Sequence, residues 1–400
     1  MRACIVAYRR YECNTHMMQF ANALVRRGDT VDVLCVGAAG ANHEDIVDGV
    51  QVWRIQRRDL DEASWVRYTI RLGSFIIRAA LVLARRHLVE PYQLVHVQSV
   101  PDFLIFAAIV PKLLRTPVIL DFRDLVPELY ASRTGAGDGS RIFRLLLFLE
   151  RISCALADHV LIANPLWYER IGHRSVSPSK CTLFWYVPDP TLFHLLPRLR
   201  NDNTFRITYP GNLNHHQGVD IAVQAFPKIL RDLPTAEFYI YGDGSERKAL
   251  AAQIARMNLE EKVKLLGILP VQDVPQAMAE SDVGIVPKRV SCQFGNEAAS
   301  TKIFEFMAVG VPVVASRTKI DECYFDDSLV RFFKSEDEDA LAEAVLSIYR
   351  DPELRDRLVE NGARFIQEGK WGSRISDYLD IVDSLTEPAA RRPYQCQQSR

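Results

Sequence analysis

Two carboxylates, Glu297 and Glu305, stand eight positions apart in the stretch NEAASTKIFEFMAVGVPVVAS, residues 296–316. The apolar residues in this stretch have helical spacing, so we expect Glu305 inside a helix and Glu297 in the loop before it. The expected helix boundaries are Ser300 or Thr301 as the N-cap and Gly310 as the C-terminal stop. A helix N-terminus is a ready site for a phosphate, and carboxylates accept hydrogen bonds from ribose and sugar hydroxyls.

The elements that must position these residues follow a regular alternation. Short β-branched runs alternate with longer helical patterns, which indicates βαβ units and parallel sheets. The runs are ACIVAY, TVDVLCVG, LVHVQS, PVILDF and HVLIAN in the first half, and FRITYPG, AEFYIYGDG, KVKLLG, DVGIVP and VPVVAS in the second. The pattern predicts two doubly wound α/β domains in tandem, and such sheets bind ligands at the carboxyl ends of their strands. We therefore expect the site in a cleft between the two domains.

The chain divides into five predicted segments. A Rossmann-like domain is expected over residues 1–190 and a second one over 205–370, joined by a proline-rich linker at 191–204. A last helix at 371–386 comes after the second domain should be complete, and we expect it to cross back onto the first. The tail, 387–400, is expected to be disordered.

Composition narrows the function class. The 400 residues have a formal net charge of −1, which excludes nucleic-acid binding by bulk electrostatics. The eight cysteines are scattered without a CxxC pair, which argues against a zinc site and a disulfide framework and favours a reducing cytosol. No window has the about 18 consecutive uncharged apolar residues that a membrane-spanning helix requires. The N-terminus lacks a signal-peptide pattern, so we predict that it forms a buried strand.

Four stretches in order resemble the retaining glycosyltransferases of family 4, which have the GT-B fold of two facing Rossmann-like domains. They are YPGNLNHHQGVDIAVQAF (209–226), IYGDGSERKAL (240–250), VKLLGILPVQDVPQAMAESDVGIVP (263–287) and the glutamate pair with MAVGVPVVAS. The resemblance covers almost the whole chain. It implies that Glu305 holds the nucleotide ribose, that Glu297 contacts the donor sugar, and that Leu266 and Gly267 lie where the family's backbone meets the base. Packing is an alternative explanation for Leu266.

The chain departs from the family where the diphosphate should bind. An Arg and a Lys are usual after the first strand of the second domain, and Asn212 and Gln217 stand at those places. We expect Lys302, in the first turn of the phosphate-binding helix, to supply the missing charge, with Lys288 or Arg289 as alternatives. The resemblance thus assigns donor binding to Glu305, Gly211, Asn212, Gln217, Gly242, Leu266, Gly267, Ser300, Thr301 and Lys288. Gly242 has an alternative explanation as a turn glycine.

In the first domain, LDFRDLVPELY (120–130) is similar to the D-x-R-D-L-x-P-E pattern of a subgroup related to N-acetylfucosamine transferases of bacterial surface-polysaccharide assembly. Charged residues at a strand end are expensive to bury, so we expect Arg123, Asp124 and Glu128 to face the cleft. The alternative is internal pairing of Asp121 or Asp124 with Arg123. The predicted catalytic residues are Glu297, Lys302, Arg123 and Asp124, and the predicted acceptor-side residues are Arg9, Arg10, His16, His96 and Glu128. His96 is alternatively a hydrogen-bonded core histidine.

The resemblance implies no cofactor and no bound metal, because a helix dipole and cations replace the metal ion. The implied partners are a nucleotide-sugar donor and a saccharide or polyprenyl-linked saccharide acceptor, with no nucleic acid. Residues 65–90 and 140–153 combine arginines with apolar residues and suggest contact with an anionic membrane. The equally weighted alternative is two ordinary helices with solvated arginines. We expect a cytoplasmic location, and peripheral contact with the inner face of the plasma membrane is a further hypothesis.

The sequence therefore predicts a retaining glycosyltransferase in polysaccharide or glycolipid assembly. Two alternatives remain: a GT-B sugar-nucleotide epimerase, and a non-catalytic membrane-associated GT-B partner protein. A dehydrogenase is disfavoured because neither half has GxGxxG after its first strand.

Overall fold

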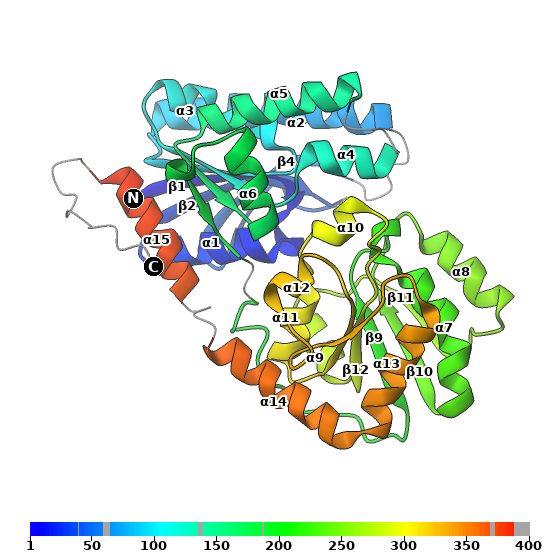
Figure 1. Cartoon of the computed structure of the whole chain (residues 1–400). Coiled ribbons are helices and arrows are strands. Elements are labelled where there is room, and N and C mark those ends of the chain that lie inside the picture. The colour runs from blue at the N-terminus through cyan, green and yellow to red at the C-terminus, as the bar shows by residue number, and fades with distance from the viewer. Residues whose placement is uncertain (39, 59–64, 135–138, 186–187, 369–372, 388–400) are drawn as a thin grey trace. The chain divides into compact units, whose positions relative to one another are not determined.

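The computed structural model describes residues 1–38, 40–58, 65–134, 139–185, 188–368 and 373–387, and the side chains of Trp65, Val66, Arg133 and Ser373 lie outside that description. The chain forms two compact units (Figure 1). Unit 1 comprises Met1–Ala131, Gly135–Trp185 and Gly372–Arg400, and unit 2 comprises Ser132–Thr134 and Tyr186–Trp371. Residues 388–400 of the predicted tail, 387–400, lie outside the described residues.

Unit 1 is built on an eight-stranded sheet in the order β3-β4-β2-β1-β5-β6-β7-β8. All neighbouring strands are parallel except the antiparallel pair β3–β4. The strands are β1 (Arg2–Arg10), β2 (Thr30–Gly37), β3 (Glu44–Val47), β4 (Val50–Arg57), β5 (Leu94–Gln98), β6 (Val118–Phe122), β7 (His159–Ile162) and β8 (Cys181–Leu183). The central strands are buried along nearly their whole length, as expected of a parallel sheet covered on both faces.

The helices of unit 1 include one from the far end of the chain. They are α1 (Thr15–Arg26), α2 (Trp65–Val89), α3 (Ile109–Leu113), α4 (Val126–Thr134), α5 (Arg141–Leu156), α6 (Pro165–Arg174) and α15 (Ser373–Thr386), with short 3-10 turns η1 (Tyr11–Cys13), η2 (Asp102–Ala108) and η3 (Pro178–Lys180). Helix α15 packs on α1 (Figure 1). The Tyr378 hydroxyl lies 3.0 Å from His96 Nδ1 in β5, and the Tyr378 ring packs at a tilt against the ring of Phe20 in α1. The last helix is therefore part of the core of unit 1.

Unit 2 has six parallel strands in the order β11-β10-β9-β12-β13-β14. The strands are β9 (Phe205–Pro210), β10 (Ala236–Tyr241), β11 (Val263–Gly267), β12 (Val283–Val286), β13 (Val313–Ser316) and β14 (Arg331–Phe333). The helices are η4 (His215–Gln217), α7 (Val219–Asp232), α8 (Arg247–Arg256), α9 (Val274–Ala279), α10 (Gln293–Glu297), α11 (Thr301–Ala308), α12 (Asp321–Tyr324), α13 (Glu338–Arg350) and α14 (Pro352–Glu368). The strand order reverses between β9 and β12, where doubly wound sheets bind their ligands.

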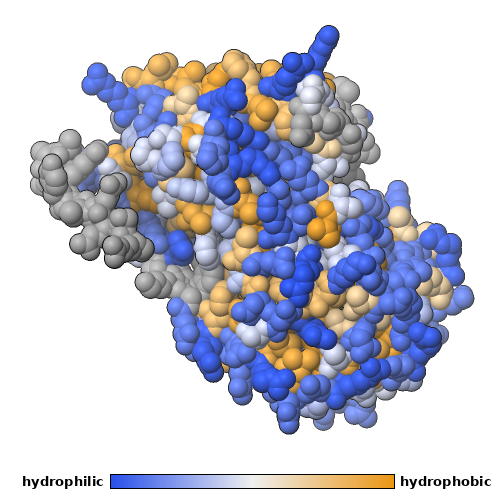
Figure 2. All heavy atoms as spheres, viewed as in Figure 1, coloured by the Kyte–Doolittle hydropathy of each residue, from blue (hydrophilic) through white to orange (hydrophobic). Residues whose placement is uncertain are grey.

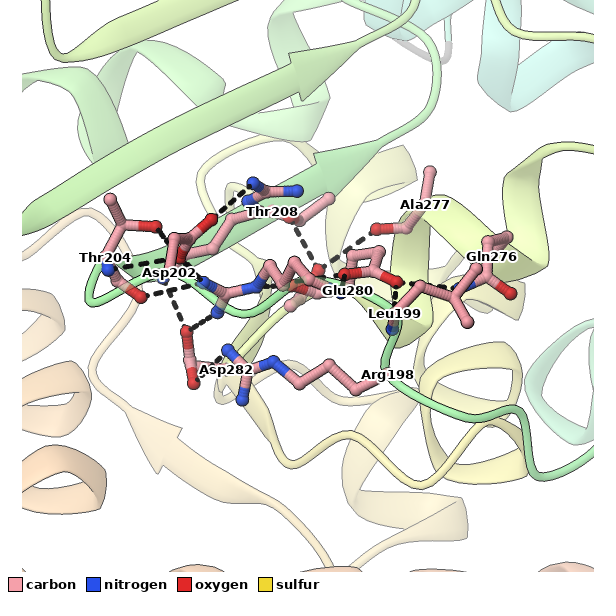
Figure 3. A network of polar contacts seen from close by, with 12 residues as sticks. Arg198, Leu199, Asp202, Thr204, Thr208, Gln276, Ala277, Glu280 and Asp282 are labelled. Atoms are coloured by element: carbon pink, nitrogen blue, oxygen red, sulfur yellow. Dashed lines mark hydrogen bonds and ion pairs between the residues drawn. The ribbon is translucent and has the colours of Figure 1, made fainter.

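Residues 197–204 of the predicted linker have no helix or strand and are bound to unit 2 through Glu280 and Asp282, which lie between α9 and β12 (Figure 3). The backbone N–H of Leu199 donates to Glu280 Oε1 (2.7 Å), and Arg200 Nε donates to the carbonyl of the same glutamate (2.7 Å). Arg198 pairs with Asp282 at 2.7 Å. This segment is therefore held against the start of β9 and β12.

The predicted α/β architecture with two parallel sheets is confirmed, and all ten β-branched runs form strands. The sequence prediction missed the β3–β4 hairpin. Its turn is Asp48-Gly49, with φ of +50° and +82°, and an Asp-Gly pair between short apolar runs is a recognised hairpin signal.

Candidate functional site

Glu297 lies at the C-terminal end of a short helix. It is the last residue of α10, and its side chain is only 7% exposed. The N–H of Ala298 donates to the carbonyl of Phe294 at 2.8 Å, and a Cβ on Gly295 would lie 2.4 Å from the carbonyl oxygen of Arg289. The predicted loop is therefore wrong at Glu297, because one helical turn is too short to show a periodic apolar pattern.

Helix α11 begins where the sequence predicted. Ser300 is its N-cap residue, Thr301 its first residue, and Gly310 with φ +78° follows its end. The Ser300 side chain makes no capping bond, and its buried hydroxyl has no hydrogen-bond partner among the described residues. The positive end of α11 thus carries a hydroxyl that can donate to a phosphate oxygen.

Lys302 is buried beside this helix end. It is 8% exposed, and its ammonium lies 3.2 Å from Gln217 Oε1 and 5.2 Å from the centre of the Tyr209 ring. No carboxylate of the described residues forms an ion pair with it. Burial lowers the pKa of Lys302 to about 8, although the Glu305 carboxylate acts in the opposite direction. A buried ammonium without a close counter-ion is costly, and an anionic ligand would supply the missing charge.

The end of β9 shapes the space around this ammonium. A Cβ on Gly211 would lie 2.2 Å from Lys302 Cε, so a larger residue would displace the lysine. The Tyr209 hydroxyl lies 2.7 Å from the Asn212 carbonyl oxygen and 3.1 Å from Gln217 Oε1. Three of the predicted donor residues, Gly211, Asn212 and Gln217, and the predicted catalytic residue Lys302 are thus brought together at the carboxyl end of β9. Tyr209 was not predicted, and its position directly before the Pro-Gly pair was the available signal.

Lys288 has a different role from the predicted donor contact. Its ammonium is 2.8 Å from Asp321 and donates to the carbonyl of Ala298 at 2.9 Å. Burial lowers the pKa of Lys288, and the Asp321 carboxylate opposes this shift. Lys288 therefore fixes the chain just before α11. Arg289, the other alternative, pairs with Asp220 and Glu336.

The ends of β10 and β11 carry the predicted donor residues Gly242, Leu266 and Gly267. A Cβ on Gly242 would lie 1.7 Å from the Gly211 carbonyl oxygen. The backbone N–H of Gly242 donates to the Gly267 carbonyl at 2.6 Å. Gly242 is therefore required by the close approach of two loops. Leu266 is 52% exposed and Ile268 is 57% exposed, so core packing does not explain Leu266. Two exposed apolar side chains therefore lie at the end of β11.

Glu305 lies inside α11, as predicted, one turn after Lys302, and its side chain is half-buried. Its carboxylate interacts electrostatically with the Lys302 ammonium. The hydroxyl of Ser300, the ammonium of Lys302 and the carboxylate of Glu305 therefore belong to one short helix. Such a set can bind a ligand that has both phosphate and hydroxyl groups.

In unit 1, Asp121 and Arg123 form an internal ion pair at the end of β6. Arg123 Nε donates to Asp121 Oδ2 at 2.7 Å, and Arg123 Nη1 lies 2.8 Å from His16 Nδ1. Burial raises the pKa of Asp121, but Arg123 and the neighbouring His96 outweigh it and bring that pKa to about 2. Burial and Arg123 together lower the pKa of His16. Of the two predicted arrangements for Arg123, the structure has internal pairing.

The other predicted residues of unit 1 divide into exposed and buried ones. Arg9 and Asp124 lie 3.8 Å apart, and their side chains are 52% and 24% exposed. Arg10 donates to the carbonyl of Arg58. His96 is 1% exposed, so the core interpretation of this residue is correct.

Glu128 was predicted to face the cleft, but its carboxylate is buried in an ion-pair network. It is 7% exposed and accepts two hydrogen bonds from Arg174, which also pairs with the fully buried Glu150. These carboxylates raise the pKa of Arg174, although burial opposes them. The charge of Glu128 is therefore satisfied inside unit 1, which the sequence did not show because Arg174 is 46 residues away.

No group of three or more His, Cys, Asp or Glu side chains within the described ranges is placed to hold a metal ion. No helix in the described part of the chain is both long enough and apolar enough to cross a membrane.

Comparison with known proteins adds independent findings. Residues 197–365 match the family model described as "Glycosyl transferases group 1", and residues 13–185 match that described as "Glycosyl transferase 4-like domain". The amylovoran biosynthesis glycosyltransferase AmsK of Erwinia amylovora is 26% identical over 157 residues, which is 39% of this chain and 39% of AmsK.

Solved structures share the fold over nearly the whole chain. The similarity to sucrose-phosphate synthase from Thermosynechococcus elongatus has a TM-score of 0.77 at 17% identity and covers 96% of this chain and 98% of that one. The Anabaena protein Alr3699/HepE, in complex with UDP and glucose, has a TM-score of 0.69 at 15% identity, with 95% and 100% covered.

Proposed function

Because this chain is a glycosyltransferase of the GT-B fold, we propose that it moves a sugar from a nucleoside diphosphate donor to an acceptor hydroxyl, with retention of anomeric configuration. The observation that carries the proposal is the buried Lys302 ammonium at the N-terminus of α11. It has no carboxylate partner among the described residues, and the unpaired Ser300 hydroxyl is on the same helix end. A diphosphate would satisfy both groups.

Each group of this site has a part in the proposed reaction. Lys302, Ser300 and the N–H groups of α11 stabilise the negative charge that grows on the leaving diphosphate. Glu305 accepts hydrogen bonds from the ribose, and Glu297 accepts one from the donor sugar. In a front-face reaction the departing phosphate takes the proton of the incoming hydroxyl, so the protein mainly positions both reactants. We expect no metal requirement, because the helix end and Lys302 provide the positive charge.

The donor is proposed to be a UDP-sugar. Leu266 and Ile268 are exposed apolar residues at the end of β11, and a base can pack on such a side chain. The structurally similar Alr3699/HepE was solved with UDP and glucose. The D-x-R-D-L-x-P-E pattern at 121–128 supports an N-acetylated amino sugar as the transferred group.

The acceptor is proposed to be a saccharide or a polyprenyl-linked saccharide in polysaccharide or glycolipid assembly. AmsK, which is similar over part of the chain, is named for amylovoran biosynthesis. In unit 1, Arg9 has an exposed side chain and Asp124 a partly exposed one, both near strand ends, and they can contact acceptor hydroxyls. Arg123 and His16 then act as positioning residues.

We also propose peripheral contact with the cytoplasmic face of a membrane. Helices α2 and α5 both pack on η2, and α3 packs on α2, so the three share one side of unit 1. Their exposed apolar residues are Ile70, Ile77, Leu81, Leu88, Val89, Ile109, Leu113, Leu114, Ile142, Leu145 and Phe148. Figure 2 shows orange spheres with blue ones between them where Figure 1 draws α3 and α5. The only acidic residue of these helices is Glu150, which is buried and paired. Helices that combine exposed apolar residues with charged residues that are basic, apart from the buried Glu150, can bind to the surface of an anionic membrane.

A thermal-shift panel of UDP-, GDP- and ADP-sugars tests the donor site. A UDP-sugar should raise the melting temperature of the wild type, because a ligand that binds the folded state stabilises it by mass action. Lys302→Met should lose most of this shift, while Lys248→Met, which changes an exposed lysine of α8, should keep it.

Incubation with donor and acceptor, followed by NMR of the product, tests the reaction. The new glycosidic bond should have the donor's anomeric configuration, and EDTA should not abolish the rate. An inverted product would refute the proposed stereochemistry. A converted sugar nucleotide without acceptor would indicate an epimerase instead.

A further inference from the structure

A buried tyrosine of the C-terminal helix makes a polar contact with a central strand of unit 1. Tyr378 of α15 is fully buried, and its hydroxyl lies 3.0 Å from Nδ1 of His96 in β5. Burial raises the pKa of Tyr378, so the hydroxyl keeps its hydrogen at neutral pH. Neither residue has a part in the reaction proposed above. The two are 282 residues apart in the sequence, so only the packing of α15 on unit 1 brings them together.

The other ring nitrogen of His96 faces Asp121 on the neighbouring strand β6. His96 Nε2 lies 3.7 Å from Asp121 Oδ2 and has no hydrogen-bond partner among the described residues. A carboxylate can only accept, so this nitrogen carries the hydrogen of the neutral ring. Nδ1 then accepts the hydrogen of the Tyr378 hydroxyl. Tyr378 therefore fixes the tautomer and the orientation of the ring that faces Asp121.

Several contacts meet at one oxygen of Asp121. Its Oδ2 atom accepts hydrogen bonds from Arg123 Nε at 2.7 Å and from Gln98 Nε2 at 3.3 Å, and Arg123 Nη2 lies 2.7 Å away. His96 Nε2 faces the same oxygen. The Asp121 carboxylate is 1% exposed, so bulk water does not take the place of a lost neighbour. A change at the His96 ring therefore changes the carboxylate that Arg123 meets.

Arg123 extends these contacts to a partly exposed histidine. Arg123 Nη1 lies 2.8 Å from His16 Nδ1 and 3.3 Å from His16 Nε2, so Nδ1 is the nearer acceptor. A guanidinium can only donate, so the hydrogen of the neutral His16 ring is on Nε2. His16 is in the first turn of α1, and the charge of Arg9 also acts on it. We call the contacts from Tyr378 through His96, Asp121 and Arg123 to His16 the Tyr378 relay.

We propose that Tyr378 is a positioning residue for the acceptor: through His96 and Asp121 it holds Arg123 and His16 in the arrangement that sugar transfer needs. Helix α15 then serves the function of unit 1 as well as its core. The inference rests on the proposed glycosyl transfer. The Tyr378 hydroxyl should affect the acceptor and not the donor, because the proposed donor site belongs to unit 2.

The variant Tyr378→Phe tests the inference, because it removes one oxygen atom and keeps the ring that packs against Phe20. The probes are UDP-N-acetylglucosamine as donor and farnesyl-diphosphate-linked N-acetylglucosamine as acceptor. The kcat/KM for the acceptor should fall about tenfold, since misplaced groups lose rate steeply. The Kd for UDP should stay the same. In the background of Arg123→Lys, Tyr378→Phe should cause little further loss, because its effect passes through Arg123.

Tyr92→Phe is the matched control. The Tyr92 hydroxyl is also buried in unit 1 and also donates to a carboxylate, that of Asp32. It lies at the amino ends of β2 and β5, whereas Asp121 lies near the carboxyl end of β6. A loss of stability alone predicts equal effects of the two variants. Positioning predicts that only Tyr378→Phe lowers the kcat/KM for the acceptor.

NMR of the protein with isotope-labelled histidine observes the Tyr378 relay without any substrate. At about pH 8, where the ring is neutral, the His16 signals should show hydrogen on Nε2 in the wild type and in Tyr92→Phe, and a mixture of tautomers in Tyr378→Phe. An unchanged His16 tautomer in Tyr378→Phe would overturn the inference, as would an equal loss of kcat/KM in Tyr92→Phe. If the tautomer changes but the wild type transfers no sugar, the proposed function fails while the link from Tyr378 to His16 stands.

Discussion

Donor affinity should depend on pH through a single lysine. The ammonium of Lys302 is placed to meet the diphosphate, and its pKa is lowered to about 8 because the side chain is buried. A lysine with a lowered pKa loses its charge as the pH rises through that value. The affinity for UDP should therefore be highest near pH 7 and fall towards pH 9.

The size of the effect follows from the protonated fraction. With a pKa of about 8, about nine tenths of Lys302 is charged at pH 7 and about one tenth at pH 9, so the Kd for UDP should rise about tenfold, or about 1.4 kcal/mol. Removing the ammonium in Lys302→Met should cost about 1.5 to 3 kcal/mol, which is about tenfold to a hundredfold in Kd.

Isothermal titration calorimetry with UDP at pH 7, 8 and 9 measures both effects. Lys302→Arg is the matched control, because a guanidinium keeps its charge throughout this range, and any pH dependence left in that variant comes from other groups or from UDP itself. The reasoning would be refuted by a wild-type Kd that is constant from pH 7 to 9, or by wild-type affinity in Lys302→Met at pH 7.

Two further predictions concern the surroundings of the site and the support of unit 1. Gly211→Ala should weaken UDP binding about tenfold and also lower the melting temperature, because its Cβ would lie 2.2 Å from Lys302 Cε and the backbone there has φ +154°, which L side chains rarely adopt; an unchanged Kd by calorimetry would contradict this. Arg174→Met should lower the free energy of unfolding by about 3 to 5 kcal/mol in urea titration, since it leaves the fully buried Glu150 without an ion pair among the described residues and leaves Glu128 with Arg170 at 3.5 Å, and a loss below about 1 kcal/mol would contradict this.

The pattern of neighbouring residues in the sequence was enough to predict those elements that are long or that belong to the repeated alternation of strands and helices. The β-branched runs and the helical spacing around Glu305 depend only on neighbours in the chain, and they predicted the strands, α11 and the two-sheet architecture correctly. The β3–β4 hairpin was missed although Asp48-Gly49 was a local signal. The helical state of Glu297 was missed because α10 is one turn long and is defined by a contact with residue 289.

The sequence by itself determined the fold class, the place of α11 and the set of side chains at its start. Only the tertiary structure decided which of these charges is engaged inside the protein. Lys288 and Lys302 look alike in the sequence, yet Asp321 neutralises the first and no described carboxylate pairs with the second. Glu128 is satisfied by Arg174, which is 46 residues away in the sequence. The physical reason is that charge pairing depends on distance in space, and residues far apart in the sequence become neighbours only when the sheets and helices pack.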